Sequence, residues 1–393
     1  MNWSKSILIA AAFFAATQVQ AQDNLINALK GNASDNSKEG FKFTEVINLG
    51  RTSIKDQGSS GTCWSYSGNS FLESEMIRMG KDPVEISQLY TARNTYVEKA
   101  KNFVRLHGEQ AQGDGGQLHD VLTIFKKYGA VPYDVYTGLP EGQSRNNFSE
   151  MSPILQSITE TVAKSKKPSK NWMSAFTGAM DSYLGEVPES FQYKGKTYTP
   201  RTFADQVIGI NPDDYVGISS FEEHAYYKPF VLLIPDNWSF ESFYNVKIND
   251  LTDIIDKALE KGFTVAWATD VSEKTFSWKN GVAFVPEKPI EKMSKEEVDQ
   301  LFNGPKAEPT ITADQRQEAF DNYETTDDHG MHIVGKVKDQ NGKEYYIVKN
   351  SWGVSNDYQG YLYATKEFVR YKTISLLVHK KALDKTMQKQ LGI

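Results

Sequence analysis

The sequence predicts an α+β protein of two subdomains, a mainly helical one followed by a β-rich one. Three observations lead to this prediction. Apolar residues make up 39% and charged residues 24% of the 393 residues, which is a globular composition able to bury a core. Helical periodicity dominates the first two-thirds of the chain. Short runs of β-type residues dominate the last third, so helices and strands segregate along the sequence.

Residues 1–21 have the features of a cleavable signal peptide. Lys5 supplies positive charge, and Ile7 to Ala16 form an apolar run that is too short to span a bilayer. Val19-Gln20-Ala21 then offers small residues for cleavage before Gln22. A buried N-terminal helix is the alternative interpretation. We therefore expect a secreted or periplasmic protein, cut after Ala21, with no membrane span.

The predicted helical subdomain comprises residues 22–250 and begins with a polar arm that extends to residue 50. A turn-rich stretch, residues 51–62, precedes a helix in which apolar residues recur from Trp64 to Met79. Three further helical regions follow, at residues 86–104, 118–128 and 148–186. Residues 225–250 alternate between apolar and polar side chains, as strands do.

The predicted β-rich subdomain comprises residues 251–380, and residues 381–393 form a C-terminal tail. Its first element is a helix over residues 251–261. Capping-box spacing predicts two later helix starts, at Ser294 with Glu297 and at Thr312 with Gln315. The predicted strands are residues 263–268, 281–285, 331–337, 345–348, 360–364 and 373–379.

Cys63 is the only cysteine in the sequence, so the chain has no internal disulfide. A lone cysteine in a secreted protein is a reactive thiol, an intermolecular partner or a buried structural residue. The predicted helix places Cys63 on its first turn, where the helix dipole favours a thiolate. A nearby imidazolium would favour the thiolate further. If the glycine-rich loop folds back over the helix start, the amide of Gln57 and the backbone N–H of Cys63 would together hold an oxyanion; otherwise Gln57 is an ordinary polar loop residue.

Three motifs resemble those of a known family. Residues 57–65 (QGSSGTCWS) resemble the active-site segment of papain-like cysteine peptidases. Residues 328–335 (DHGMHIVG) and 350–353 (NSWG) resemble that family's His and Asn segments, in the expected order. The Ser-Ser-Gly-x-Cys-Trp form is that of the bleomycin hydrolase and aminopeptidase C branch. The resemblance implies a papain-like two-subdomain fold with an insertion at about residues 140–250.

The resemblance also assigns the partners of Cys63. His329 is expected to be the base, because Gly330 follows it and Gly335 lies six residues on, as in the family. His332 meets neither condition and is expected to be a packed strand residue or a supporting contact. Asn350 would orient the imidazole. Trp352 would cover that contact and exclude water, a role compatible with simple core packing.

The resemblance implies further features of the cleft and its substrates. Gly115 and Gly116 would form the wall that binds substrate backbone, since glycines permit close approach, unless they form a plain turn. Trp352 is also expected to contribute to substrate binding beside these glycines. Relatives in this branch are aminopeptidases that form hexameric cages, and their C-terminal tail enters the cleft. A homo-hexamer is therefore expected.

The predicted function is a cysteine peptidase, in particular an aminopeptidase acting on peptide substrates through a thioester. The alternatives are a papain-like endopeptidase or dipeptidyl-peptidase, and an inactive papain-like binding protein. No cofactor is expected, and no metal site, because the histidines show no ligand spacing. A net charge of −6 argues against a nucleic-acid partner, which would require a basic face.

Overall fold

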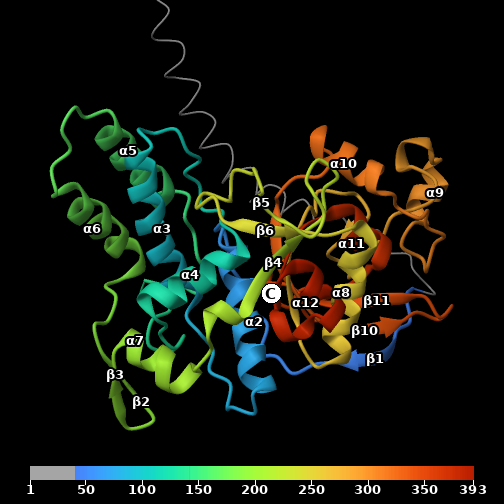
Figure 1. Cartoon of the computed structure of the whole chain (residues 1–393), viewed down its shortest axis with the longest axis horizontal. Helices are drawn as coiled ribbons and strands as arrows, with labels where there is room; N and C mark the ends of the chain where they lie inside the picture. The colour runs from blue at the N-terminus through green and yellow to red at the C-terminus, as the bar shows by residue number, and fades with distance from the viewer. Residues whose placement is uncertain (1–39, 141) are drawn as a thin grey trace, which may run out of the picture.

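The computed structural model describes residues 40–140 and 142–393, and the predicted signal peptide lies outside these residues. Figure 1 shows two halves side by side, with helices α3 to α7 on one side and most of the strands on the other. This arrangement of helices and sheet confirms the predicted α+β class. None of the helices in these residues combines the length and the apolar character needed to cross a membrane.

The helical half is built around α2, which is buried along most of its length. Its helices are α2 (Cys63–Arg78), α3 (Gln88–Arg105), α4 (Leu118–Tyr128), α5 (Met151–Ala163), α6 (Trp172–Leu184) and α7 (Pro200–Phe203). Ser87 caps α3 by accepting a hydrogen bond from the Tyr90 N–H at 3.0 Å. Gly129 ends α4 with a φ of 83°, a conformation that favours glycine. A small hairpin, β2 (Phe191–Tyr193) with β3 (Lys196–Tyr198), precedes α7.

The β-rich half contains one mixed sheet whose strand order is β5-β6-β4-β13-β7-β10-β11-β12-β9-β8, with β1 paired to β10. Its strands are β1 (Thr44–Asn48), β4 (Tyr215–Ser219), β5 (Pro229–Val231), β6 (Ser242–Asn245), β7 (Val265–Thr269), β8 (Phe276–Ser277), β9 (Val282–Ala283), β10 (His329–Lys338), β11 (Glu344–Lys349), β12 (Tyr361–Thr365) and β13 (Thr373–His379). Strands β4, β5 and β6 come from residues 140–250, which the sequence analysis grouped with the helical subdomain. They extend this sheet because β4 pairs with β13. Residues 44–48 of the predicted polar arm likewise join the sheet as β1.

Helices α8 (Ile248–Glu260), α11 (Lys366–Lys372) and α12 (Lys385–Leu391) pack on the apolar core of the sheet. Met387 and Leu391 of α12 are buried in this core. The tail that follows β13 is therefore folded against the β-rich half. None of residues 381–393 lines the large cleft described below.

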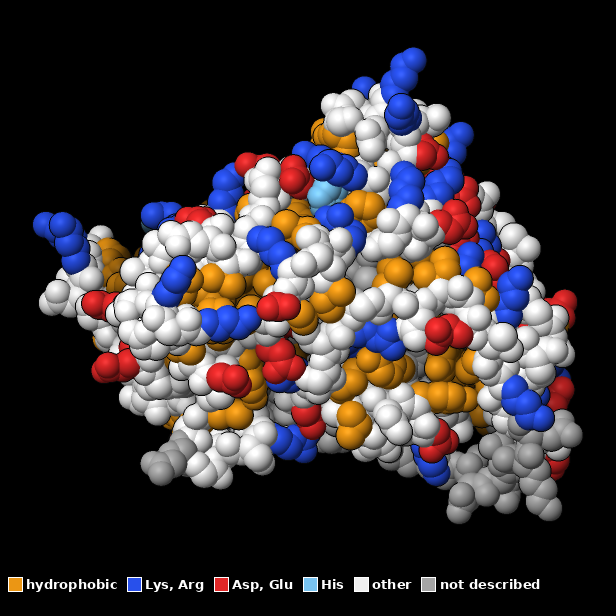
Figure 2. Space-filling model, turned by 90° about the horizontal axis from the view of Figure 1, so that it is seen from below, with side chains coloured by type: hydrophobic (Ala, Val, Ile, Leu, Met, Phe, Trp, Pro, Cys, Tyr) orange, Lys and Arg blue, Asp and Glu red, His pale blue; other side chains and the backbone are white. Residues whose placement is uncertain are grey.

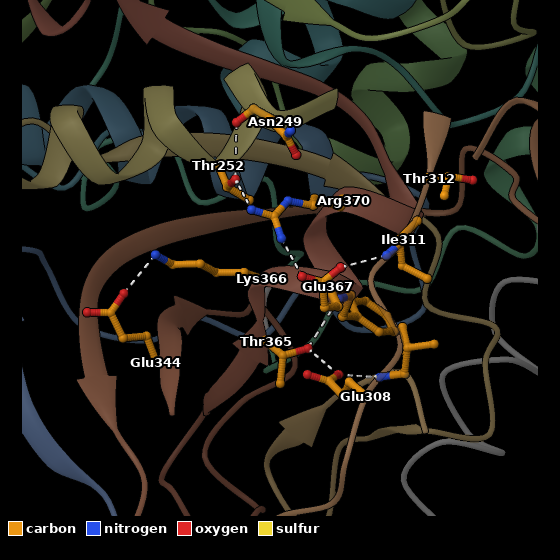
Figure 3. A network of polar contacts seen from close by, with 12 residues as sticks. Asn249, Thr252, Glu308, Ile311, Thr312, Glu344, Thr365, Lys366, Glu367 and Arg370 are labelled. Carbon is orange, nitrogen blue, oxygen red and sulfur yellow. Dashed lines mark hydrogen bonds and ion pairs between the residues drawn. The ribbon is translucent and has the colours of Figure 1, made fainter. Parts of the chain in front are cut away.

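A polar network fixes the irregular segment between β9 and β10 to the sheet (Figure 3). The Ile311 N–H donates to Glu367 on α11 at 2.9 Å, and the Thr365 hydroxyl donates to Glu308 at 2.7 Å. Lys366 forms an ion pair with Glu344 of β11 at 2.7 Å. The contacts of Ile311 and Glu308 hold the chain that leads into α10 (Ala313–Asp321), whose C-terminal end lines the large cleft. The segment also contains the short helix α9 (Lys295–Asp299), and both predicted capping boxes are present.

The surface is mixed in charge on the face shown in Figure 2. Lys and Arg side chains are interspersed with Asp and Glu side chains there, and apolar side chains lie between them. The net charge of −6 is thus not accompanied by a dominant basic patch on this face.

The two halves meet where the first turn of α2 packs on β10. A Cβ atom on Gly330 of β10 would lie 2.8 Å from Ser67 Oγ and 3.1 Å from Trp64 Cα. Such distances are too short for a side chain, so only glycine allows the helix backbone to approach the strand this closely. The contact places Cys63, the first residue of α2, beside the first residues of β10.

We predict that Gly330→Ala destabilises the protein, because the added methyl group must push α2 away from β10. Overpacking of this kind costs about 1–3 kcal/mol. Thermal or urea unfolding measures the change. Gly178→Ala is the matched control, since Gly178 lies in α6 with no atom within 4 Å of an added Cβ. That control should be neutral or gain up to about 1 kcal/mol from helix propensity. Equal stability of the two variants would contradict the close approach at Gly330.

Candidate active site

A cleft of about 620 Å³ lies between the two halves. It is bounded by the start of α2, by the loop before α4, by the loop between β5 and β6, and by the chain from α10 to β10. The lining residues that matter below are Cys63, Gly115, Gly116, Asp236, Asp327 and His329. Helices and strands from both halves therefore contribute to one site.

Cys63 is the first residue of α2 and is only 5% exposed. The helix begins there after the turn of residues 58–62, as the sequence predicts. Burial raises the pKa of the Cys63 thiol to about 12, and the nearby charges of Asp236 and Asp327 act in the same direction. Hydrogen bonds from the backbone of Gly330 and Trp64 oppose this shift. These bonds stabilise a thiolate when one forms.

His329 begins β10 and is held by Asn350. The two side chains form a hydrogen bond of 2.7 Å between His329 Nε2 and Asn350 Oδ1. Asn350 Oδ1 also accepts from the Ser351 N–H at 2.7 Å. An amide oxygen only accepts hydrogen bonds, so Nε2 of His329 carries a proton and Nδ1 is left as the basic nitrogen of the neutral ring. Burial lowers the pKa of His329 to about 4, with the Asn350 hydrogen bond opposing it, so the ring is neutral at physiological pH.

Gln57 is fully buried between the Cys63 loop and the Asn350 segment. Its amide Nε2 donates to the Ser60 carbonyl at 2.7 Å, and its Oε1 accepts from the Ser351 hydroxyl at 2.7 Å. Its backbone N–H also donates to the Ser351 carbonyl at 2.8 Å. Gln57 thus joins the loop that precedes Cys63 to the chain that carries Asn350, and it is not among the residues that line the cleft. The described hydrogen bonds engage one of its two amide hydrogens.

Gly115 and Gly116 line the cleft on the helical side. A Cβ atom on Gly116 would lie 2.8 Å from the ring of Trp64, and one on Gly115 would overlap the carboxylate of Asp236. The Trp64 indole in turn donates to the Asp114 carbonyl at 3.0 Å. The absence of side chains at both positions therefore lets the Trp64 ring and the Asp236 carboxylate pack directly against the glycine backbone of the cleft wall.

Trp352 and His332 lie outside the residues that line the cleft. The Trp352 ring packs 4.6 Å from the His329 ring and is itself covered by Phe276 and Trp278. It therefore shields the His329–Asn350 hydrogen bond from behind and does not form part of the cleft wall with the two glycines. His332 is buried toward α2, where its Nδ1 lies 3.0 Å from the Ser70 hydroxyl.

Asp236 and Asp327 are cleft carboxylates that the sequence motifs did not indicate. Asp327 lies two residues before His329, and Gln117 donates to it at 2.5 Å. Its position two residues before His329 is the one sequence feature that points to Asp327 as a cleft residue. Asp236 lies in the loop between β5 and β6, far from any recognised motif, and no sequence pattern marks it. Only the folding of that loop over the cleft brings Asp236 to the site.

Comparisons with known proteins agree with this arrangement. A family model described as the Peptidase C1-like family matches residues 1–392. Aminopeptidase G of Lactobacillus delbrueckii subsp. lactis is 24% identical over 405 residues, which cover 92% of this chain and 89% of the relative. Aminopeptidase C of Lactococcus lactis subsp. cremoris is 23% identical, with 94% and 90% covered.

A solved structure supports the fold. The crystal structure of PepW from Lactobacillus rhamnosis superposes with a TM-score of 0.71 at 22% identity, covering 94% of this chain and 91% of that one. At this identity the similarity concerns the fold. Because the family model spans nearly the entire sequence, this protein belongs to the Peptidase C1-like family.

Proposed function

We propose that this protein is a cysteine aminopeptidase, which removes residues from the free N-terminus of peptides. One observation carries the proposal: a lone thiol at the start of a helix and a neutral, Asn-oriented imidazole line the same cleft between two halves of the fold. Family membership and relatives named aminopeptidase support this reaction class. The inactive binding protein is disfavoured, since Cys63, His329 and Asn350 are all present.

The residues would divide the reaction as follows. Nδ1 of His329 accepts the proton of the Cys63 thiol as the sulfur attacks the scissile carbonyl carbon. The imidazolium then gives this proton to the leaving amine as the C–N bond breaks, which leaves a thioester on Cys63. Water then loses a proton to His329 as it attacks the thioester carbon, the C–S bond breaks to release the carboxylic acid, and the imidazolium returns its proton to the Cys63 sulfur. Asn350 keeps the imidazole in the required tautomer throughout.

The oxyanion would be stabilised by the Cys63 backbone N–H and by the free amide hydrogen of Gln57. The other hydrogen of that amide is engaged by the Ser60 carbonyl, which fixes its plane. A donor that is already oriented does not need to reorganise during the reaction, so it favours the transition state over the ground state.

Cleavage mapping tests the proposed function. The purified protein, incubated with peptides of known sequence, should release residues in order from the free N-terminus, as read by mass spectrometry. Cys63→Ala should abolish release, and pre-treatment with iodoacetamide should do the same by alkylating Cys63. Internal cuts at the outset would instead identify an endopeptidase, and initial release of dipeptides would identify a dipeptidyl-peptidase. A wild-type protein that neither reacts with iodoacetamide nor cleaves any peptide would overturn the proposal.

We predict that Gln57→Ala lowers kcat by about 100-fold, because removal of one oxyanion donor has an effect of this order. KM should change little, since the lost hydrogen bond forms mainly in the transition state. Steady-state kinetics on a fluorogenic aminoacyl substrate measures both values. Gln57 also bridges to Ser351, so Ser351→Ala serves as the control that removes the bridge but keeps the amide. An equal loss in both variants would show a purely structural role for Gln57.

Location and assembly complete the proposal. The basic, apolar and small-residue segments of residues 1–21 support export and cleavage after Ala21. N-terminal sequencing of the protein from an expressing bacterium should then begin at Gln22, and an intact Met1 would contradict export.

The resemblance to the bleomycin hydrolase branch supports a homo-hexamer. Light scattering should give about six times the mass of the mature chain, and a monomer mass would contradict it.

A further inference from the structure

The loop between β5 and β6 presents a carboxylate to the cleft. Its residues Leu233, Ile234, Pro235 and Asp236 line the cleft together with the chain that carries His329. The loop is held from behind by Asn237, whose Nδ2 donates to the carbonyls of Leu232 and Glu241, each at 2.9 Å. The position of Asp236 is thus fixed by its anchored neighbour.

Trp238 adds a second anchor. This residue is buried, and its indole N–H donates to Asp120 of α4 at 2.8 Å. The loop is therefore tied to the helical half, although the strands on either side of it belong to the sheet. Asp236 reaches the cleft from a segment held on both sides.

The carboxylate of Asp236 lies on the two-glycine wall. A Cβ atom on Gly115 would overlap both of its oxygens, so the acid fills the space that the missing side chain leaves. It is also close enough to Cys63 for its charge to raise the pKa of the thiol. The acid therefore stands where peptide backbone running along Gly115 and Gly116 would lie, near the attacking sulfur.

In the described part of the chain, this carboxylate makes no hydrogen bond and no ion pair with another side chain. Lys99 is the neighbouring cation, but its ammonium group donates to the carbonyls of Gly113 and Gly115, each at 2.6 Å. Burial raises the pKa of Asp236 to about 6, with the charge of Lys99 opposing the shift, so the acid is ionised at neutral pH. A partly desolvated carboxylate without a direct partner is costly, and a cationic ligand would offset that cost.

We propose that Asp236 binds the α-ammonium group of the peptide substrate against Gly115 and Gly116, and so selects substrates with a free N-terminus. The inference rests on the proposed peptidase function and adds the group that recognises the N-terminus. An ammonium group offers three hydrogens to the carboxylate and to nearby backbone carbonyls. The Asp236 side chain also occupies the space along this wall into which a peptide without a free N-terminus at this point would continue. An acylated or longer peptide therefore cannot form the ion pair and has no room beside the carboxylate.

The location of the C-terminal segment agrees with this assignment. Residues 381–393 pack on the β-rich half and do not line the cleft. Asp327, the other acid beside Cys63, already accepts a hydrogen bond from Gln117, and burial raises its pKa well above the usual range. Asp327 therefore has a hydrogen-bond partner within the protein, whereas the carboxylate of Asp236 has none among the described residues.

The test compares Asp236→Asn with the wild type on matched substrates. These are coumarylamides of alanine, leucine, lysine and arginine, each with a free or an N-acetylated amine. The wild type should cleave the free amines preferentially. In Asp236→Asn, kcat/KM for the free amines should fall by about 30-fold or more, mainly through KM, which is the scale of losing one partner of a desolvated charge pair. The ratio of free to acetylated cleavage should fall toward one.

Two controls separate recognition from folding. Asp253→Asn removes an exposed acid on α8, outside the cleft, and should keep the wild-type ratio. Alkylation of Cys63 by iodoacetamide should be no slower in Asp236→Asn, because removing the acid removes a charge that raises the thiol pKa. A loss on free amines together with undiminished alkylation therefore reports weaker binding of the ammonium group and not a damaged thiol.

The outcomes distinguish the two proposals. If the wild type cleaves coumarylamides and Asp236→Asn keeps the full preference for free amines, the role of Asp236 is refuted and the peptidase function stands. Equal wild-type cleavage of free and acetylated substrates also refutes it, again leaving a peptidase. A wild type that cleaves neither set and resists alkylation refutes both.

Discussion

The close approach of the first turn of α2 to strand β10 is the contact on which the site depends. It is possible because Gly330 has no side chain where Ser67 and Trp64 pack against the strand. Through it, a cysteine from the helical half and a histidine from the β-rich half come to line one cleft, although they are 266 positions apart in the sequence. The glycine therefore serves the geometry of the site without taking part in its chemistry.

Burial at this junction shifts the pKa values of Cys63 and His329. Desolvation disfavours both the thiolate and the imidazolium, so the resting pair is a thiol beside a neutral ring. Three features favour charge separation once a substrate is bound: the start of α2, the backbone bonds to the sulfur and the Asn350 hydrogen bond. Trp352 supports the same arrangement from behind by covering the imidazole, which keeps water from competing for the Asn350 oxygen.

The residue proposed to select the substrate comes from a different part of the chain than the residues proposed to catalyse the reaction. The thiol and the imidazole lie on regular elements, whereas Asp236 lies on a loop between two short strands at the edge of the sheet. Loops tolerate variation more easily than the elements that they connect. Substrate selection by such a loop could change during evolution without disturbing the contact between α2 and β10.

The sequence by itself determined the local features. Polar caps and glycine stops placed the ends of α3 and α4, and the turn before Cys63 placed the thiol at a helix start, because these signals act within a few residues. The motifs around Cys63, His329 and Asn350 are also contained within a few residues each, so they indicated the reaction class without the structure. Tertiary structure alone decided the rest. Pairing of β4 with β13 brought residues 215–245 into the sheet, α12 packed on the core, and Asp236 came to lie over Gly115. Each of these contacts joins residues far apart in the chain, and their formation depends on shape and burial that no local pattern encodes.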